Sequence, residues 1–280
     1  MSAEPTEDAR TATDPSRAAQ FLSLHHQERP LLLANAWDPG SARLLASLGF
    51  QALATTSSGY AATLGCLDYG ITREQALAHA GSLVKATELP VSADLENGFA
   101  DEPGAVAETV RLAAGVGLAG CSVEDWSPSR RRIYEIEHAV ERVAAAAEAA
   151  HANGSRLVLT ARAENYLRER LDRDDTIERL RRFEQAGADV LYAPAMDAAE
   201  DIAALIQAVE RPVNVLARPG APSVEELASL GVARVSVGGA FAFAALGAAA
   251  NAAQELLSEG TYGFTELAGA GARAARAAFS

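Results

Sequence analysis

Cysteine is scarce in this chain of 280 residues, which contains only Cys66 and Cys121. Two cysteines are too few for a disulfide framework, and they do not have the CxxC spacing of a zinc site. A lone cysteine is more often a small packed residue than a nucleophile, so we expect both side chains to be buried.

Long apolar runs and an excess of positive charge are also missing. No apolar run approaches the ~18–20 residues of a membrane-spanning helix, and the N-terminus lacks the basic-then-apolar pattern of a signal peptide. The chain carries 37 acidic against 24 basic residues, a formal net charge of −13. That charge argues against nucleic acid or an anionic membrane as a partner. We therefore expect a soluble, cytoplasmic protein.

Several catalytic motifs are absent as well. The sequence has no GxSxG nucleophile motif, no Walker motif and no dinucleotide-binding glycine pattern, which excludes the enzyme classes that depend on them. None of the five histidines, listed here as His25, His26, His79, His138 and His151, follows an apolar run. We expect most of them on helix surfaces, and we do not expect a histidine base.

Apolar and helical segments alternate along the chain. Short apolar runs, typical of buried strands, occur at 31–34, 52–55, 91–93, 120–123, 157–160, 190–192, 213–216 and 234–237. Helical stretches separate them at 39–48, 72–87, 102–116, 135–153, 176–186, 198–209, 223–230 and 240–257, and a further one covers 264–279. Thr72, Asp101 and Asp175 are the expected N-caps, and glycines such as Gly49 and Gly231 are expected to end helices.

Eight strands that are each followed by a helix predict a (β/α)8 TIM-type barrel with an extra C-terminal helix. An open, doubly wound α/β sheet is the alternative, but the count of eight favours the closed barrel. Hydrophobic residues make up 49% of the chain, enough for one large core. We assign residues 1–17 to a disordered tail, 18–260 to the barrel and 261–280 to a C-terminal helical extension.

Carboxylates follow two neighbouring strands of the predicted barrel. Active sites of such barrels lie at the C-terminal ends of the strands. Alternation along a strand places Asp94 and Glu96 on one face, and Glu124 ends the adjacent strand about 4.8 Å away. Three converging carboxylates repel one another unless a cation lies between them, and all-oxygen ligands favour Mg²⁺, with Mn²⁺ possible. Alternatively, Asp94 and Glu96 cap a helix and Glu124 pairs with an arginine.

Two further segments end strands. Arg162 can hold a substrate carboxylate with two parallel hydrogen bonds, or form a structural ion pair with Glu124. Ser57, Ser58 and Gly59 are expected at a tight turn, where hydroxyl and N–H groups can cradle an anion. The basic triplet at 130–132 is more typical of solvated loop charges than of a substrate contact.

Together these segments resemble the isocitrate lyase and phosphoenolpyruvate mutase superfamily. The resemblance covers residues 31–247 and is carried by NAWDPGSARLLASLGF, TTSSGYAATLGCLD, ADLENGF, SVED, TARAENYL, PVNVLARPG and ARVSVGGA. It implies an Mg²⁺-dependent barrel enzyme that makes or breaks a C–C or P–C bond next to the enolate of a small 2-oxo acid. It also implies a homo-oligomer, a dimer or tetramer, because the family commonly assembles as dimers of dimers with exchanged C-terminal helices.

The resemblance also assigns roles to residues. Metal-shell carboxylates are Asp94, Glu96 and Glu124, and the catalytic residues are Asp68, Arg162 and Glu124. The substrate carboxylate is held at Ser57, Ser58 and Gly59, and the oxo-acid oxygens bind Arg162. Tyr192 and Asn214 are expected to line the pocket.

One segment departs from the family pattern. From Glu124 onward the chain reads EDWSPSRRRIYEIEHAVERV, and this segment lacks the Lys-x-Cys-Gly-His motif of the isocitrate and methylisocitrate lyases. It also lacks the lysine and asparagine of the phosphonopyruvate-directed relatives. The sequence therefore favours a lyase, hydrolase or decarboxylase of an oxaloacetate-like acid. A citrate-lyase-β-type aldolase and a non-catalytic dicarboxylate-binding barrel are the alternatives.

Overall fold

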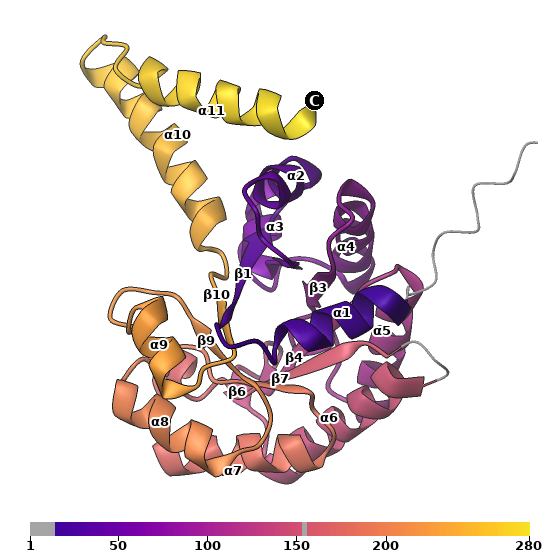
Figure 1. Ribbon diagram of the computed structural model, residues 1–280. Helices are drawn as coiled ribbons and strands as arrows, with labels where there is room; N and C mark the ends of the chain where they lie inside the picture. Colours follow the sequence, from indigo (N-terminus) through magenta and orange to yellow (C-terminus); the bar gives the residue numbers. More distant parts are fainter. Residues whose placement is uncertain (1–14, 153–155) are drawn as a thin grey trace, which may run out of the picture.

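The computed structural model describes residues 15–152 and 156–280. Parallel strands close into a barrel in the order β1–β10–β9–β8–β7–β4–β3–β2 (Figure 1). The barrel strands are β1 (Leu31–Ala36), β2 (Leu53–Thr55), β3 (Val91–Asp94), β4 (Gly120–Glu124), β7 (Val158–Arg162), β8 (Val190–Tyr192), β9 (Val213–Leu216) and β10 (Arg234–Ser236). The predicted TIM-type barrel is confirmed.

Helices surround this barrel. They are α1 (Pro15–Leu24), α2 (Pro39–Ser47), α3 (Ser57–Thr63), α4 (Arg73–Ala86), α5 (Pro103–Gly115), α6 (Ile136–His151), α7 (Arg173–Gln185), α8 (Ala199–Ala208), α9 (Val224–Leu230), α10 (Ala240–Ser258) and α11 (Thr265–Phe279). The sequence pattern did not predict helices α1 and α3 or the hairpin of β5 (Trp126–Ser127) and β6 (Arg132–Ile133). A short 3-10 helix, η3 (Tyr166–Arg168), follows β7.

Local signals set several helix ends. Thr72 caps α4 as predicted, and its side chain accepts from Gln75 N in a capping box. Asp175 is not the cap of α7, because the helix starts earlier and Asp172 accepts from the Asp175 N–H at 3.0 Å. Asp101 is not a cap either, since α5 starts after Glu102 without a side-chain cap. The expected glycines Gly49 and Gly231 have φ of 97° and 90°, conformations that favour glycine.

Helix α1 closes the N-terminal end of the barrel. Phe21 and His25 are buried there, at 0% and 3% exposure, which corrects the expectation of a helix-surface position for His25. Phe21 packs so closely on β4 that a Cβ at Gly120 would lie 2.8 Å from its ring. Helix α1 begins inside the expected 1–17 tail; residues 1–14, and residue 153 of the expected 135–153 helix, lie outside the described residues.

The two cysteines differ in their exposure to solvent. Cys121 is buried in the cluster between strands and helices, as expected. Cys66 is exposed, so the expectation of burial is wrong for it. The reason is its place in the segment after α3, which lies at the surface.

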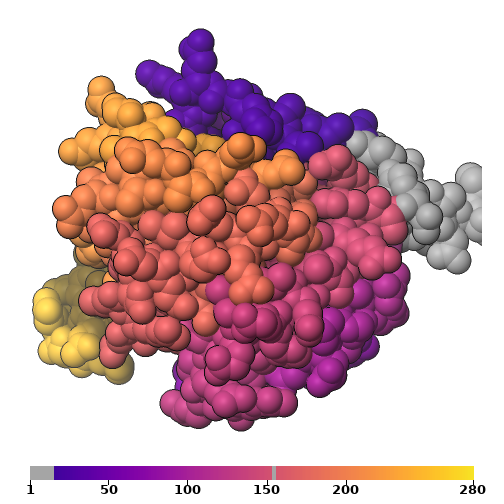
Figure 2. Space-filling model, turned by 90° about the horizontal axis from the view of Figure 1, so that it is seen from below, coloured from indigo at the N-terminus to yellow at the C-terminus, as the bar shows by residue number. Residues whose placement is uncertain are grey.

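Helix α10 extends away from the barrel and α11 turns back, so that its C-terminal end contacts α2 (Figure 1); Figure 2 shows this yellow segment standing out from one side of the molecule. Ala242 is the only buried residue in the 19 residues of α10. By length and composition α10 is apolar enough to span a membrane, with mean hydropathy 1.2. The expectation that no segment reaches this length is therefore wrong, because small alanines make the helix apolar. The proposed domain boundaries stay a prediction.

Candidate functional site

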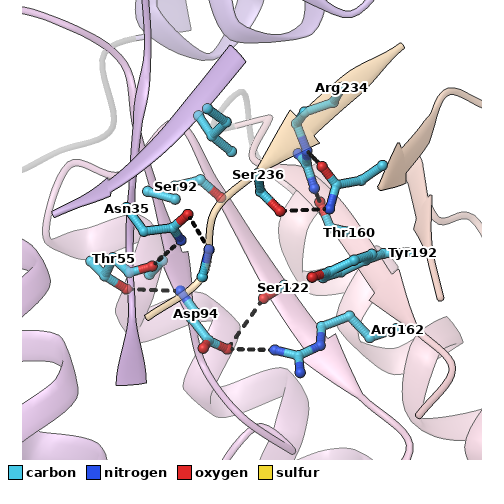
Figure 3. A pocket seen from close by; sticks show the side chains of 15 residues that line it. Asn35, Thr55, Ser92, Asp94, Ser122, Thr160, Arg162, Tyr192, Arg234 and Ser236 are labelled. Atoms are coloured by element: carbon cyan, nitrogen blue, oxygen red, sulfur yellow. Dashed lines mark hydrogen bonds and ion pairs between the residues drawn. The ribbon is translucent and has the colours of Figure 1, made fainter. Parts of the chain in front are cut away.

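A small cavity lies inside the barrel (Figure 3). Its volume is about 60 Å³. Polar side chains dominate its lining, among them Asn35, Thr55, Ser92, Asp94, Ser122, Thr160, Arg162, Tyr192, Asn214, Arg234 and Ser236. Tyr192 and Asn214 therefore lie where the resemblance puts them, on the wall of the cavity. Ser122 alternates with the helix-facing Cys121, as the pleat of β4 requires.

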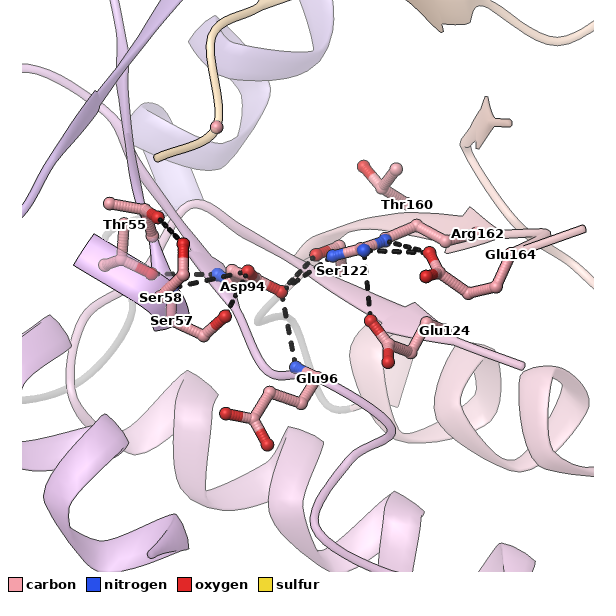
Figure 4. Close-up of polar contacts among 12 residues, drawn as sticks. Thr55, Ser57, Ser58, Asp94, Glu96, Ser122, Glu124, Thr160, Arg162 and Glu164 are labelled. Carbon is pink, nitrogen blue, oxygen red and sulfur yellow. Dashed lines mark hydrogen bonds and ion pairs between the residues drawn. The ribbon is translucent and has the colours of Figure 1, made fainter. Parts of the chain in front are cut away.

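Arg162 is the centre of the polar network at the end of β7 (Figure 4). Its Nη1 donates to Asp94 Oδ1 at 3.0 Å, and its Nη2 lies 3.0 Å from Glu124 Oε2. Glu164 Oε1 accepts from both Nε and Nη2, at 3.1 and 2.8 Å. Burial alone would lower the pKa of Arg162, but Glu164, Glu124 and Asp94 together raise it well above its usual value. The guanidinium also lies over the Tyr192 ring, 5.5 Å from its centroid.

Ser57 connects two carboxylates from different segments. Its hydroxyl lies 3.0 Å from Asp94 Oδ2 and 2.9 Å from Asp68 Oδ1. Although Asp68 is exposed as a residue, its carboxyl group faces inward. Desolvation there, and then the charge of Asp94, raise the pKa of Asp68. Asp68 thus lies beside Asp94 at the mouth of the barrel.

The expected turn at Ser57, Ser58 and Gly59 is instead the first turn of helix α3. The Gly59 N–H donates to Thr56 Oγ1 at 3.2 Å, so the N-cap already occupies it. The expectation of a free N–H cradle at Gly59 is therefore wrong. A Cβ on Gly59 would lie 2.5 Å from Thr56 Cγ2 and 3.0 Å from Ala242 Cβ. Glycine is needed here because α3 and the start of α10 approach each other closely.

Glu96 does not share a face with Asp94, because β3 ends at Asp94 and the chain turns. Glu96 has φ of 50°, and Figure 4 shows its carboxylate pointing away from Arg162. Its side chain is buried and its Oε1 has no hydrogen-bond partner. Desolvation, followed by the charges of Asp94 and Asp68, raises the pKa of Glu96 to about 8.

The predicted convergence of Asp94, Glu96 and Glu124 is not what the geometry shows. In the part of the chain that the structure describes, no three His, Cys, Asp or Glu side chains are placed to hold a metal ion. Arg162 joins Asp94 to Glu124, while Glu96 stands apart. The chemistry of the residues nevertheless fits a hard cation, since a buried Glu96 oxygen lacks a partner and the nearby donors are carboxylates. The metal site stays a prediction.

Sequence reasoning missed Tyr69 and Arg168, which lie beside Glu124. The Tyr69 hydroxyl donates to Glu124 Oε1 at 2.7 Å, and Arg168 Nη2 donates to the Tyr69 oxygen. Arg168 also lies over the Trp126 ring, 4.2 Å from its centroid, and 3.3 Å from Glu164 Oε2. Desolvation, and then the charge of Glu164, raise the pKa of the buried Glu124 well above its usual range. Of the residues in this network, Glu164 is the one whose position in the sequence suggested a place near Arg162, because it follows Arg162 by two residues.

The segment after Glu124 is the short hairpin β5–β6, and it holds its basic triplet away from the cavity. Arg130 Nε lies 3.3 Å from Asp101 Oδ2, and its side chain is half-exposed. Arg131 and Arg132 are exposed. Ser127 and Tyr134 also donate to Asp101. The hairpin therefore contacts the loop before α5. Its basic triplet is exposed to solvent, as predicted.

Comparisons with known proteins identify the family of this chain. The family model described as phosphoenolpyruvate phosphomutase matches residues 21–257. A candidate lyase/mutase from Burkholderia cenocepacia J2315 is 52% identical, covers 90% of this chain and 91% of its own, and superposes with a TM-score of 0.87.

Two solved enzymes are more distant. Oxaloacetate acetylhydrolase in complex with the product oxalate is 26% identical, with a TM-score of 0.80 over 89% of each chain. A 2,3-dimethylmalate lyase of the PEP mutase/isocitrate lyase superfamily is 26% identical, with a TM-score of 0.79 over 88% of this chain and 89% of its own. The predicted resemblance is confirmed: this chain belongs to the phosphoenolpyruvate phosphomutase family, within the PEP mutase/isocitrate lyase superfamily.

Proposed function

We propose that this protein is an Mg²⁺-dependent enzyme that cleaves a C–C bond next to the enolate of a small, oxaloacetate-like 2-oxo acid. The observation that carries this proposal is the buried Arg162 guanidinium at the mouth of the barrel, held by Asp94, Glu124 and Glu164. Hydrolysis or decarboxylation is the favoured reaction.

The substrate class follows from Arg162 and its neighbours. Three carboxylates fix the plane of the Arg162 guanidinium, so its remaining N–H group meets an anionic oxygen in a defined direction. The named relatives act on related molecules: one is an oxaloacetate acetylhydrolase that binds oxalate, and another is a 2,3-dimethylmalate lyase. A C4 oxo acid or its two-carbon product therefore suits this site.

Asp94, Glu96 and Glu124, with Asp68 beside them, are the residues that would hold the metal ion. When bound, Mg²⁺ acts as a Lewis acid that stabilises negative charge on substrate oxygens. One Glu96 oxygen has no hydrogen-bond partner, and the pKa values of Asp68, Glu96 and Glu124 are raised. Both observations indicate closely spaced negative charge, which a bound cation would neutralise. Mn²⁺ has the same ligand preference.

The other steps fall to side chains of this chain. Arg162 binds and orients the oxo-acid oxygens and stabilises the developing enolate. At the opposite wall the Ser58 hydroxyl is the donor for the substrate, and the Ser57 hydroxyl holds Asp94 and Asp68 in place. Asp68, held by Ser57 at 2.9 Å, positions a water molecule or accepts its proton during hydrolysis.

The proton for the departing enolate comes from solvent. The hairpin after Glu124 offers Ser127, Ser129 and Tyr134, whose hydroxyls are poor acids near neutral pH. Burial also raises the pKa of Tyr134. For this reason we expect little cleavage of isocitrate or methylisocitrate.

A parallel assay tests the proposal. Purified protein with Mg²⁺ is offered oxaloacetate, phosphonopyruvate, isocitrate and methylisocitrate, and products are followed by chromatography. We expect turnover of oxaloacetate that stops on chelation, and Asp68→Asn should lower kcat with KM nearly unchanged. Asp174→Asn, a change of an exposed side chain, is the control. Robust isocitrate cleavage would refute the argument from the missing acid.

Absence of turnover with all four substrates would favour the non-catalytic dicarboxylate-binding barrel. Turnover of a thioester instead would favour the citrate-lyase-β-type aldolase. A homo-oligomeric state and a cytoplasmic location belong to the same proposal, and the first of these is tested below.

A further inference from the structure

A second arginine lies inside the barrel, deeper than Arg162. Arg234 is the first residue of β10, paired in register with Leu31 at the start of β1 and with Asn214. Its side chain is 4% exposed and lines the same cavity, on the side away from Asp94 (Figure 3). A charged group is therefore buried in the middle of the barrel.

Among the described residues, the hydrogen-bond partners of this guanidinium are neutral. Its Nε donates to Asn214 Oδ1 at 2.9 Å, its Nη2 to Thr160 Oγ1 at 3.1 Å and its Nη1 to His25 Nε2 at 3.1 Å. His25 accepts as a neutral imidazole, because its Nδ1 lies 2.7 Å from the Phe21 carbonyl oxygen. Desolvation, and then the charge of Arg234, lower the pKa of His25 to about 3.

No carboxylate within residues 15–152 and 156–280 lies within 4.0 Å of Arg234, whereas the partially and fully buried arginines Arg162, Arg168 and Arg179 each have at least two. A guanidinium carries five N–H donors, and three bonds leave two without a partner described here. Burial lowers the pKa of Arg234 to about 10, and no carboxylate charge counteracts that effect.

Arg142 is a useful comparison. It is 1% exposed and also lacks a carboxylate partner among the described residues, but it donates to the carbonyl oxygens of Asn97, Ala100 and Asp101. Its guanidinium lies over the Tyr134 ring, 4.2 Å from the centroid, and the charges of Asp101, Asp125 and Glu124 act on it. Carbonyl dipoles and nearby acids thus balance Arg142, whereas in the described part of the chain Arg234 has neutral side-chain partners and the neighbouring Tyr192.

Buried charges in proteins are paired or shift their protonation, and arginine does not lose its proton. Asp94 is the carboxylate of the cavity lining, but it already binds Arg162 and Ser57. A volume of about 60 Å³ admits a particle of the size of one or two water molecules. We propose that a single small monovalent anion of the halide class binds in this cavity against Arg234. This proposal rests on the contacts of Arg234 and not on the proposed reaction, although Arg162 and Arg234 line the same cavity.

Two measurements on the full chain test the proposal without substrate or metal. In crystals soaked in bromide, we expect an anomalous peak in the cavity in contact with the Arg234 guanidinium. In solution, we expect the midpoint of thermal unfolding to be higher in sodium chloride or bromide than in sodium gluconate at equal ionic strength. The difference should be about 3 °C at ten times the dissociation constant.

Arg234→Gln should remove the difference between chloride and gluconate, and Arg211→Gln, at an exposed position, should leave it unchanged. If Arg234→Gln does not fold, the bromide crystal of the unaltered chain decides. Equal stability in both salts, a halide response that survives Arg234→Gln, or a cavity without a bromide peak would overturn the proposal.

Discussion

The Tyr69 hydroxyl donates a hydrogen bond to Glu124 Oε1 at 2.7 Å, across 55 positions of sequence. This bond ties the segment between α3 and α4 to the end of β4. Tyr69 has φ of 62°, so the backbone is held in a conformation that non-glycine residues rarely adopt. Because the same segment carries Asp68, the bond positions both carboxylates at the mouth of the barrel.

Tyr69→Phe removes this hydrogen bond and keeps the ring. The bond lowers the pKa of Glu124, so its loss raises that pKa further, and the acid limb of kcat/KM moves to higher pH. We also expect a loss of about 1 kcal/mol in the free energy of unfolding. Tyr166→Phe, which removes a bond to Asp201 at 2.8 Å, is the control and should not move the pH profile.

Arg162→Lys keeps the charge but loses the planar pattern of donors. Lysine cannot bond Asp94, Glu124 and Glu164 in one plane and still present an N–H group to a substrate. We expect turnover of oxaloacetate to fall roughly 100-fold or more, measured by steady-state kinetics. Arg111→Lys, in an exposed ion pair with Glu108, is the control. Near-normal turnover would make Arg162 a structural partner of Glu124.

Asp94→Ala should abolish Mg²⁺-dependent binding of oxalate while the barrel remains folded. Asp94 is the carboxylate that contacts both Arg162 and Ser57, so its loss removes a metal ligand and releases both partners. In the unaltered protein, oxalate at ~100 times its dissociation constant should stabilise the fold by about 2.7 kcal/mol. A thermal shift with and without chelator measures both. Binding that persists unchanged in Asp94→Ala would contradict the assignment.

Acid should destabilise the barrel through His79. This buried imidazole stacks on Tyr60 with centroids 3.9 Å apart, and its Nε2 lies 3.0 Å from the Trp37 carbonyl oxygen. Desolvation lowers the pKa of His79 to about 4 from 6.5. Between these values the unfolded chain binds more protons than the native one, so stability falls as pH falls.

The contribution of His79 to the free energy of unfolding should decrease by about 3 kcal/mol from pH 6.5 to 4. Denaturant titrations at several pH values measure it. His79→Gln should flatten this part of the profile, whereas His26→Gln, at an exposed position, should not. An unchanged slope in His79→Gln would show that other groups cause the acid sensitivity.

The arm of α10 and α11 should lie in contact with a second copy of the chain. Large apolar side chains are exposed along it, including Phe243, Leu246, Leu256, Leu257, Leu267 and Phe279. Exposed apolar surface of this extent is typical of an interface. We expect a dimer or tetramer by light scattering. Leu246→Glu should shift the equilibrium toward smaller species, and Leu48→Glu, exposed outside the arm, should not.

The amino-acid sequence determined the barrel and the inventory of polar residues at its mouth. Apolar runs, helix-ending glycines and the Thr72 cap are local signals, and local signals specify strands and helices directly. Once eight strand–helix units are present, the closed barrel brings the residues after each strand to one end. Asp94, Arg162, Tyr192 and Asn214 therefore line one cavity, and Glu124 pairs with Arg162 beside it; the strand ends indicated Asp94, Glu124 and Arg162, and the family resemblance indicated Tyr192 and Asn214.

Only the tertiary structure decided where these side chains point. Glu96 turns away because its φ is 50°, which the alternation of an extended strand does not include. Arg234 meets His25 across 209 positions, and Tyr69 meets Glu124 across 55. Such contacts depend on the closure of the barrel and on the directions of loops. A side chain's direction after the end of a strand is set by backbone angles and distant packing partners, and the local sequence pattern specifies neither.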